Sequence, residues 1–392
     1  MRIAADKDCT GCMACVDACR HGVLQAKVDG NGYYAINAAN PSACVECGLC
    51  TRVCPILNPH KQDGMSTPYA AWNTQAERRK LSASGGIFAA IASVVLQRGG
   101  VVYGAAIEGF DVRHRRITDL RDLHLLQGSK YQHSDMTGVH EQVRQDLRQG
   151  LYVLFSGLGC QVAGLLSFLG KIDKSRLYTI DTICGGLSTM LPMQLLRQSG
   201  KYSGIRSFRD KENGWQSIGF KYSLKMVRND GSIDNLGLDN LVLNTFSSKL
   251  LKRSSCLDCQ FTGFHRDSDC TIGDFWGDSR FKQQHAQGLS IVIIHNCRIM
   301  QLIEAANMEL QPITWPEAVA SNKNIYWTHY PAIRHFWSRK IALNAMRRND
   351  VTTATKQMAT NTFPGLLLRI YLKMNNILCK LYFQVKIQEL GK

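Results

Sequence analysis

The sequence lacks the long apolar segments of a membrane-spanning protein. No uninterrupted apolar run in its 392 residues approaches the roughly 20 residues of a transmembrane helix. The first ten residues contain few apolar side chains, so we expect no secretory signal peptide. No nucleic-acid-recognition motif, low-complexity tract or repeat outside the cysteine motifs is visible. These absences predict a cytoplasmic protein whose thiols stay reduced.

Acidic residues are also scarce, because 31 Asp and Glu stand against 47 Lys and Arg, which leaves a net charge of +16. Up to His60 the two signs balance at five each, so the whole excess lies after residue 60. A basic body suits an anionic flavin dinucleotide, an acidic redox partner or an anionic membrane surface. Nucleic acid is less favoured, because charge without a recognition motif is only a weak indication.

Cysteine, by contrast, is abundant, and eight of the fifteen cysteines lie between residues 9 and 54. They form two runs with the spacing C-x2-C-x2-C-x3-C, namely Cys9, Cys12, Cys15 and Cys19, then Cys44, Cys47, Cys50 and Cys54. This spacing is typical of a bacterial ferredoxin with two 4Fe–4S clusters, in which the fourth cysteine of each run binds the other cluster. We therefore predict one cluster on Cys9, Cys12, Cys15 and Cys54, and its twin on Cys44, Cys47, Cys50 and Cys19.

Zinc and disulfide bonds are the alternatives for these cysteines. Zinc sites take four ligands from two separated pairs, whereas each run here supplies four closely spaced thiols. Disulfides need an oxidising compartment, of which the sequence gives no sign. Pro55 follows Cys54 as the ferredoxin pattern requires, although Arg20 takes the corresponding place after Cys19. Because such clusters pass single electrons at low potential, the predicted function is electron transfer.

The fold class that we predict is α+β, with a small bacterial-ferredoxin-like domain fused to a larger mixed α/β flavin-binding domain and a helical tail. The predicted parts are a ferredoxin-like domain at 1–60, a linker at 61–68, a larger domain at 69–320 and a basic helical region at 321–392. In the larger domain, helices are expected at 87–97, 140–148, 161–169 and 298–308, and strands at 101–106, 151–156, 177–183 and 289–294. After Pro192 the pattern favours strands, including 218–225, as far as Phe246.

Seven cysteines lie outside the ferredoxin motifs: Cys160, Cys184, Cys256, Cys259, Cys270, Cys297 and Cys379. Cys160 and Cys184 follow consecutive predicted strands, whose ends meet at the ligand-binding crevice of an α/β sheet. Cys256 and Cys259 form a C-x2-C pair on a predicted loop, so these four thiols suffice for a third cluster. A lone free cysteine is usually a small apolar packing residue, and we interpret Cys297 and Cys379 as packing in the core or on the surface.

Further motifs follow the ferredoxin-like cysteines. SCLDCQF (255–261) precedes RDSDCTIGDFWG (266–277), and earlier stretches read SASGG (82–86), GSKY (128–131), FSGLGCQ (155–161) and FRDKENGW (208–215). Over nearly all of residues 1–320 the chain resembles the coenzyme F-420 hydrogenase/dehydrogenase beta-subunit family, in its bacterial form with a fused ferredoxin domain. The resemblance implies bound FAD, iron–sulfur clusters and electron transfer between a flavin and a partner or substrate.

The resemblance also strengthens the prediction of a third cluster on Cys160, Cys184, Cys256 and Cys259. The chain departs from the family at Gly159 and Gly185, where proline and histidine are usual. At Cys270 the family has an apolar residue, so Cys270 is not counted as a ligand.

The SASGG stretch precedes a predicted apolar helix. Glycines let a backbone approach a phosphate, and serine hydroxyls and helix N–H groups can donate to it. Taken alone, the stretch is better interpreted as an N-cap. The resemblance implies that it holds FAD, with Ser82, Ser84, Gly85 and Gly86 as the binding residues. Ser129, Lys130 and Tyr131 are expected to add a cation and an aromatic ring near the flavin, with an ordinary surface loop as the alternative.

No catalytic residue can be assigned from the sequence. Asp274, Phe275 and Trp276 close the family signature, and we interpret them as packing between cluster and flavin rather than as acid–base groups. His265, beside the C-x2-C pair, is the nearest candidate proton donor, although a structural role is favoured for it.

The tail at 363–392 carries five basic residues and only Glu389 as an acid, with apolar residues at helical spacing. Such a helix can lie on an anionic membrane at the inner face or pack on the protein's own body, which we favour.

Two functions remain open. The first is a FAD-dependent iron–sulfur oxidoreductase acting on a small molecule, for which the resemblance suggests surface-polysaccharide biosynthesis as a context. The second is an electron-transfer subunit of a larger redox complex, with a ferredoxin or a dehydrogenase subunit as its partner. The use of coenzyme F-420 itself is left open.

Overall fold

The computed structural model describes residues 2–60, 66–209, 211–212, 215, 223–237, 240–277, 279–325 and 336–359. The predicted tail at 363–392, Cys379 and most of the strand predicted at 218–225 lie outside these residues, as do residues 61–65 of the predicted linker. Within the described part of the chain, no helix is both long and apolar enough to cross a membrane.

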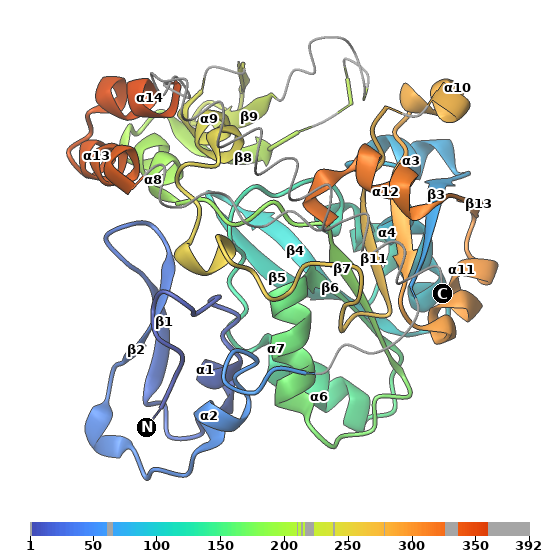
Figure 1. The fold of residues 1–392 in the computed structure, drawn as a ribbon, viewed down its shortest axis with the longest axis horizontal. Coiled ribbons are helices and arrows are strands. Elements are labelled where there is room, and N and C mark those ends of the chain that lie inside the picture. The colour runs from blue at the N-terminus through green and yellow to red at the C-terminus, as the bar shows by residue number, and fades with distance from the viewer. Residues whose placement is uncertain are drawn as a thin grey trace.

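Residues 2–60, which we call the ferredoxin-like region, fold around a hairpin that is drawn in blue in Figure 1. β1 (Leu24–Val28) pairs antiparallel with β2 (Tyr34–Ala38). The first cysteine run contains α1 (Ala14–Ala18), and the second contains α2 (Leu49–Arg52), with a 3-10 turn at Pro41–Ala43 before it. Each cysteine run therefore contains one short helix.

The rest of the chain, which we call the body, is built on an eight-stranded mixed sheet with the order β13-β3-β12-β11-β7-β6-β4-β5. Its strands are β3 (Thr67–Asn73), β4 (Val101–Glu108), β5 (Asp111–Ile117), β6 (Val153–Leu158), β7 (Leu177–Thr182), β11 (Cys270–Asp274), β12 (Ser290–Ile294) and β13 (Met308–Pro312). The four strands β4, β6, β7 and β11 run parallel to one another. The pairings of β5 with β4, β12 with β11, β3 with β12 and β13 with β3 are antiparallel. Because Leu158 of β6 pairs with Thr182 of β7, the carboxyl ends of these strands lie side by side.

Successive side chains of the sheet point to two different cores, as the period of two in a strand requires. On β4, Val102 packs in a core with α4 (Ile87–Gln97), α5 (Leu123–Leu126) and α11 (Met300–Ala305). The neighbouring Tyr103 packs in the opposite core with α6 (Val139–Arg148) and α7 (Gly159–Leu169). This second core also contains Met13, Leu24 and Ile36. One apolar core therefore joins the ferredoxin-like region to the body.

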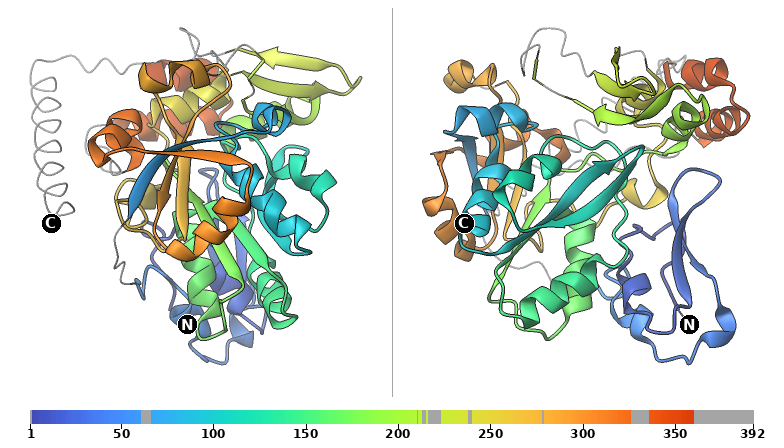
Figure 2. Two further views of the ribbon diagram at one scale, coloured as in Figure 1. Left: turned by 90° about the vertical axis from the view of Figure 1, so that its right-hand side faces the viewer. Right: turned by 180° about the vertical axis from the view of Figure 1, so that it is seen from behind.

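A second layer covers one end of the body (Figures 1 and 2). It consists of a three-stranded antiparallel sheet, β8 (Tyr202–Ser207), β9 (Leu224–Arg228) and β10 (Ile233–Leu236), with helices α8 (Leu191–Gln198), α9 (Leu241–Ser248), α13 (Phe336–Arg347) and α14 (Val351–Ala359) beside it. The remaining helices are α3 (Ala76–Leu81), α10 (Lys282–His285) and α12 (Trp315–Ser321).

The predicted fold class is confirmed, since a small ferredoxin-like region, a large mixed sheet and C-terminal helices are all present. The predicted helix at 87–97 is α4, and the strand at 289–294 is β12. The helix predicted at 298–308 runs too far, because α11 ends at Ala305 and Met308 begins β13, which pairs with β3. The β-rich interpretation after Pro192 is also wrong in part. Pro192 lies in the first turn of α8, where its missing N–H costs no hydrogen bond, and a second helix, α9, occupies 241–248.

Candidate electron-transfer site

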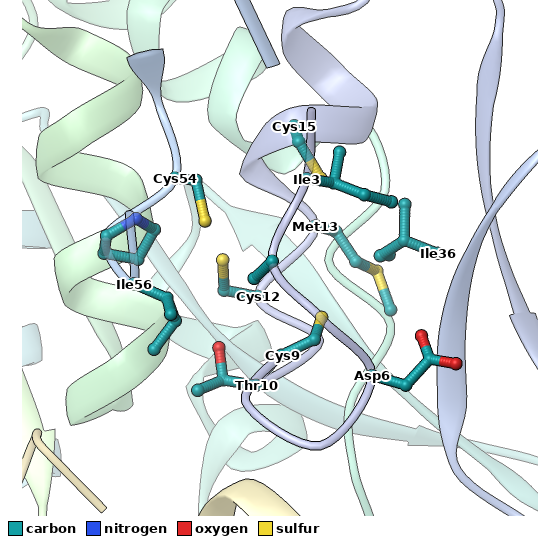
Figure 3. A pocket seen from close by; sticks show the side chains of 12 residues that line it. Ile3, Asp6, Cys9, Thr10, Cys12, Met13, Cys15, Ile36, Cys54 and Ile56 are labelled. Carbon is teal, nitrogen blue, oxygen red and sulfur yellow. The ribbon is translucent and has the colours of Figure 1, made fainter. Parts of the chain in front are cut away.

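A cavity lies at the first cysteine run (Figure 3). Four thiols line it, those of Cys9, Cys12, Cys15 and Cys54. In the close-up, the sulfur atoms of Cys12 and Cys54 point toward each other. Most other wall residues are apolar, among them Ile3, Ala4, Met13, Ile36, Pro55 and Ile56. These are the four thiols that the crossed ferredoxin pattern assigns to one cluster, and we call them the first thiol set.

The thiols do not converge as they would on one ion. Among the described residues, no three His, Cys, Asp or Glu side chains are close enough together to hold a single metal ion. A 4Fe–4S cluster makes a different demand, because each thiolate binds its own iron and the four sulfurs stay apart around the cluster. No disulfide joins any of the described cysteines, which are all free thiols.

The second thiol set, Cys19, Cys44, Cys47 and Cys50, faces solvent. Cys47 is exposed and the other three are half-buried. The adjacent Val45 is 60% exposed, which is unusual for an apolar side chain. Cys12 of the first set is buried, by contrast. The two sets thus differ at one position each, since the first contains the buried Cys12 and the second contains the exposed Cys47.

The four candidate ligands of a third cluster, which we call the third thiol set, come from three distant segments. Cys160 and Cys184 each lie two residues beyond the paired Leu158 and Thr182, so the sheet places them side by side. Cys256 ends a 3-10 turn at Ser254–Cys256, and Cys259 follows it. The backbone amide of Leu187 donates to Sγ of Cys256 at 3.4 Å, which ties the loop after β7 to the C-x2-C pair.

The thiols of the third set are close enough to influence one another. Burial raises the pKa of Cys256 to about 11 and the pKa of Cys259 to about 12. Burial raises the pKa of Cys160 well above its ordinary value, and the neighbouring Cys259, Cys256 and Cys184 raise it further. Metal ions bind the thiolate form, so iron bound here would hold these groups deprotonated despite their burial.

A buried hydrogen-bond network supports the end of β7, three residues before Cys184. Asp181 is fully buried and accepts hydrogen bonds from Nη1 of Arg266 at 2.8 Å, from Oγ of Ser268 at 2.9 Å and from Oγ1 of Thr271. Thr271 also contacts Nε2 of His295 at 2.8 Å. Sequence reasoning missed this network, although Arg266 and Ser268 both stand in the RDSD stretch of the family signature.

The unusual Gly159 has a steric reason. A Cβ at this position would lie 2.7 Å from the carbonyl oxygen of Phe261 and 3.0 Å from Oδ2 of Asp181. A larger residue, proline included, would therefore displace the loop after Cys259 or the buried Asp181.

The SASGG stretch makes several contacts within the protein. Oγ of Ser84 donates to the carbonyl of Leu289 at 2.7 Å, and the amide of Gly85 donates to Oγ of Ser290 at 2.9 Å. A Cβ on Gly85 would lie 2.5 Å from the carbonyl oxygen of Ala71, so only glycine fits against β3. Gly86, with φ 84, precedes α4.

The other predicted flavin residues lie next to this stretch. Nε2 of Gln127 donates to Oγ of Ser82 at 2.9 Å, which joins the 82–86 and 127–131 segments. Nζ of Lys130 donates to the carbonyls of Leu126 and Gln127 at 2.9 and 2.7 Å, and burial lowers the pKa of Lys130 to about 7. Tyr131, two residues after Ser129, stacks on Phe246 with ring centroids 4.1 Å apart.

Four motifs that are far apart in the sequence meet at Arg209 and Trp215. The guanidinium of Arg209 pairs with Asp274 at 3.0 Å and also hydrogen-bonds Tyr131. The indole N–H of Trp215 donates to the carbonyl of Ala83 at 3.0 Å, and its ring stacks on Trp276 at 4.3 Å. The name motif junction is used below for the following residues: Ala83, Tyr131, Arg209, Trp215, Asp274 and Trp276.

The motif junction lies at the same sheet edge as the third thiol set. Asp274 ends β11, which runs parallel to β7 and pairs with it. A Cβ on Gly273 would lie 2.6 Å from Cδ1 of Ile183, the residue before Cys184. Phe275 is fully buried and Trp276 is stacked, while Asp274 is ion-paired, and the packing of these three residues between cluster and flavin stays a prediction. His265 has a buried Nδ1 with no hydrogen-bond partner among the described residues.

Asp17 of α1 anchors the ferredoxin-like region to the body. Its carboxylate accepts from the amide of Gly138 at 2.7 Å, from the amide of His140 at 3.2 Å and from Nδ1 of His140 at 2.7 Å. The side chains of His140 and Asp17 are 0% and 3% exposed. Asp17 thereby caps the first turn of α6 from another part of the chain.

Replacing Asp17 by alanine should loosen this contact. The change leaves three buried donors without their acceptor, so we expect the free energy of unfolding to fall by about 2–4 kcal/mol. Asp8→Ala, an exposed acid of the same region, is the matched control and should leave stability unchanged. Urea unfolding of anaerobically prepared protein measures both. Equal midpoints for the two variants would contradict the anchoring role.

Two families of known proteins match parts of this chain. Residues 151–314 match the C-terminal part of the beta subunit of coenzyme F420 hydrogenase/dehydrogenase, and residues 8–57 match a 4Fe-4S dicluster domain. A solved structure of the xenon-derivatised F420-reducing [NiFe] hydrogenase complex from Methanosarcina barkeri is similar at 15% identity and a TM-score of 0.43. The similarity covers 78% of this chain and 97% of that chain. No curated protein matches the sequence.

The two matched segments contain both ferredoxin-type cysteine runs and every cysteine of the third thiol set. The N-terminal part is thus a 4Fe–4S dicluster domain, and the protein is an iron–sulfur electron-transfer protein of the hydrogenase/dehydrogenase type. Residues 151–314 are thus similar to the C-terminal part of the coenzyme F420 hydrogenase/dehydrogenase beta subunit, and the same chain carries a 4Fe–4S dicluster domain at residues 8–57.

Proposed function

We propose that this protein is an iron–sulfur flavoprotein oxidoreductase that carries three 4Fe–4S clusters and one FAD. The clusters would be held by the first, second and third thiol sets. When bound, such clusters supply one-electron transfer, and a flavin links this to two-electron chemistry on a small molecule. The observation that carries the proposal is the convergence of the third thiol set, since Cys160, Cys184 and the Cys256–Cys259 pair come from three separate segments.

The residues around the third thiol set suit a cluster. Cys160 packs with Ala163 and Phe261 in a small apolar group that also includes Cys259. These side chains keep water from the thiols, and the amides of Gly186 and Leu187 donate to the sulfurs of Cys184 and Cys256 at 3.3 and 3.4 Å. Hydrogen bonds to cluster sulfurs and exclusion of solvent are two features by which a protein sets the reduction potential of a cluster.

The motif junction supports FAD binding beside the third thiol set. It joins the SASGG and GSKY stretches, which include Ser82, Ser84, Gly85, Gly86, Ser129, Lys130 and Tyr131. Lys130 and Arg209 add basic side chains beside these stretches. Tyr131 and Trp276 add aromatic rings, which stack on Phe246 and Trp215. The hydroxyl of Ser84 and the amide of Gly85 already donate hydrogen bonds within the protein. The backbone N–H groups of Gly86 and of the first turn of α4 are therefore the better donors to a phosphate.

The exposed second thiol set supports exchange with an external redox partner. Cys47 and Val45 lie open to solvent, so a one-electron carrier protein can approach this side of the dicluster domain. An electron-transfer subunit without its own substrate would use the same path. Turnover of a small molecule by the isolated chain would favour the enzyme, whereas constant co-purification with another redox subunit would favour the relay.

Cofactor content tests the proposal. Anaerobically purified or reconstituted protein should contain about 12 irons, since three clusters of four irons are expected, and one FAD per chain. Colorimetric iron analysis and the absorbance of released flavin measure these amounts. A value of about eight irons would remove the third cluster, and absence of flavin would leave an iron–sulfur protein without flavin chemistry.

A further inference from the structure

Helix α7 contacts both the first and the third thiol sets. Cys160 lies in its first turn, and Gly164 lies four residues later on the same face of the helix. A Cβ added to Gly164 would lie 2.9 Å from Sγ of Cys12 and 3.0 Å from Cβ of Cys12. The backbone of α7 therefore rests directly against a cysteine of the first thiol set. Figure 1 shows α7 alongside α1, the helix that follows Cys12.

The next residue on this face extends the same contact. Phe168, four residues after Gly164, packs in an apolar group that contains Cys12, Ala14, Ala18 and Val53 of the ferredoxin-like region. Residues 160, 164 and 168 thus form a stripe that faces the dicluster domain. Gly164 is the residue of this stripe that leaves room for the side chain of Cys12.

The other half of the third thiol set is tied to the first set by hydrogen bonds. The carbonyl oxygen of Cys9 accepts from Nε of Arg253 at 2.6 Å and from Oγ of Ser255 at 2.9 Å. Ser255 directly precedes Cys256. Cys160 and the Cys256–Cys259 pair of the third thiol set are therefore each held beside a cysteine of the first set.

We propose that Gly164 is a positioning residue that sets the distance between the first and third thiol sets, so that α7 forms the path for electrons between the dicluster domain and the body. This inference rests on the proposed third cluster. The physical reason is that electron tunnelling between two centres weakens steeply as their separation grows. A side chain at position 164 would push α7 away from Cys12 and lengthen that separation.

Two substitutions of Gly164 test the proposal in the full chain. Gly164→Ala adds one methyl group, and Gly164→Leu adds a large side chain, while both favour the helix by up to about 1 kcal/mol. A loss therefore cannot come from weaker helix formation. Gly104→Ala is the matched control, because this glycine is buried in β4 and a Cβ there would be 3.4 Å from Leu126, away from any thiol set.

The readout is the electron paramagnetic resonance spectrum of protein reduced with dithionite, together with iron content. Wild-type protein and Gly104→Ala should show signals broadened by magnetic coupling between the reduced first and third clusters. In Gly164→Leu the coupling should weaken, and electron exchange between the two sets should slow measurably, because the tunnelling rate falls with each increase in the separation of the two centres. Gly164→Ala should show a smaller change in the same direction.

Unchanged coupling and unchanged exchange in both Gly164 variants would overturn the inference while leaving the third cluster in place. A wild-type protein with only about eight irons would instead show that the proposed function itself is wrong. If Gly164→Leu loses iron, the test rests on the milder Gly164→Ala variant. That variant must then lose coupling while it keeps its full iron content.

Discussion

Changing Cys160 to serine is expected to remove about four irons and leave about eight in place. The same cluster should be lost from the Cys184→Ser, Cys256→Ser and Cys259→Ser variants. The reason is geometric, since the parallel pairing of β6 and β7 places Cys160 beside Cys184, and Leu187 links that loop to Cys256. Only a shared group would make thiols from three distant segments depend on one another.

Two other cysteines provide the controls for this series. Cys270 is fully buried within β11, and Cys297 is exposed at the start of a 3-10 turn. Cys270→Ser should cost about 1–3 kcal/mol of stability and no iron, because a buried hydroxyl replaces an isolated thiol. Cys297→Ser should change neither quantity. If Cys160→Ser and Cys184→Ser keep the wild-type iron content, the third cluster does not exist.

Changing Arg266 to methionine is expected to lower the free energy of unfolding by about 3–5 kcal/mol. The guanidinium of Arg266 is 2% exposed and the carboxylate of Asp181 is 0% exposed, so water cannot replace the lost partner. Asp181 would remain as a buried charge with only the hydroxyls of Ser268 and Thr271 as donors. Chemical unfolding of the anaerobic protein measures the loss.

The double variant Arg266→Met with Asp181→Asn separates the ion pair from simple packing. The double variant should lose less free energy of unfolding than the sum of the two single variants, because each single change leaves one buried charge unpaired and the double variant leaves none. Arg121→Met provides the surface control, since the exposed pair of Arg121 with Asp119 should contribute nothing measurable. Strictly additive losses in the double variant would contradict a buried ion pair beneath the third thiol set.

Short sequence patterns predicted the elements whose formation depends on residues close together in the chain. The glycine pair before an apolar run predicted α4, and the cysteine spacing predicted a 4Fe–4S dicluster domain. The strand-end positions of Cys160 and Cys184 also followed from pattern alone, because parallel strands share an edge. The helix predicted at 298–308 runs too far because Met308 gains more by pairing with β3 than by continuing α11 beyond Ala305.

The contacts that join distant segments could not be read from the sequence. Arg266 and Asp181 are 85 residues apart, and nothing in either local stretch names the other as its partner. Gly164 looks like an ordinary helix-weakening glycine until α7 is placed against Cys12. The meeting of four motifs at Arg209 and Trp215 likewise depends on the fold as a whole.

Flavin reduction by an external electron donor tests the central claim most directly. A reduced low-potential ferredoxin is mixed anaerobically with the FAD-loaded wild-type protein or with Cys160→Ser, and the visible absorbance of the flavin is followed. In the wild-type protein the flavin should be reduced rapidly. In Cys160→Ser the dicluster domain should still be reduced while the flavin stays oxidised, because the third thiol set can no longer pass electrons on. Flavin reduction in Cys160→Ser at the wild-type rate would contradict the account.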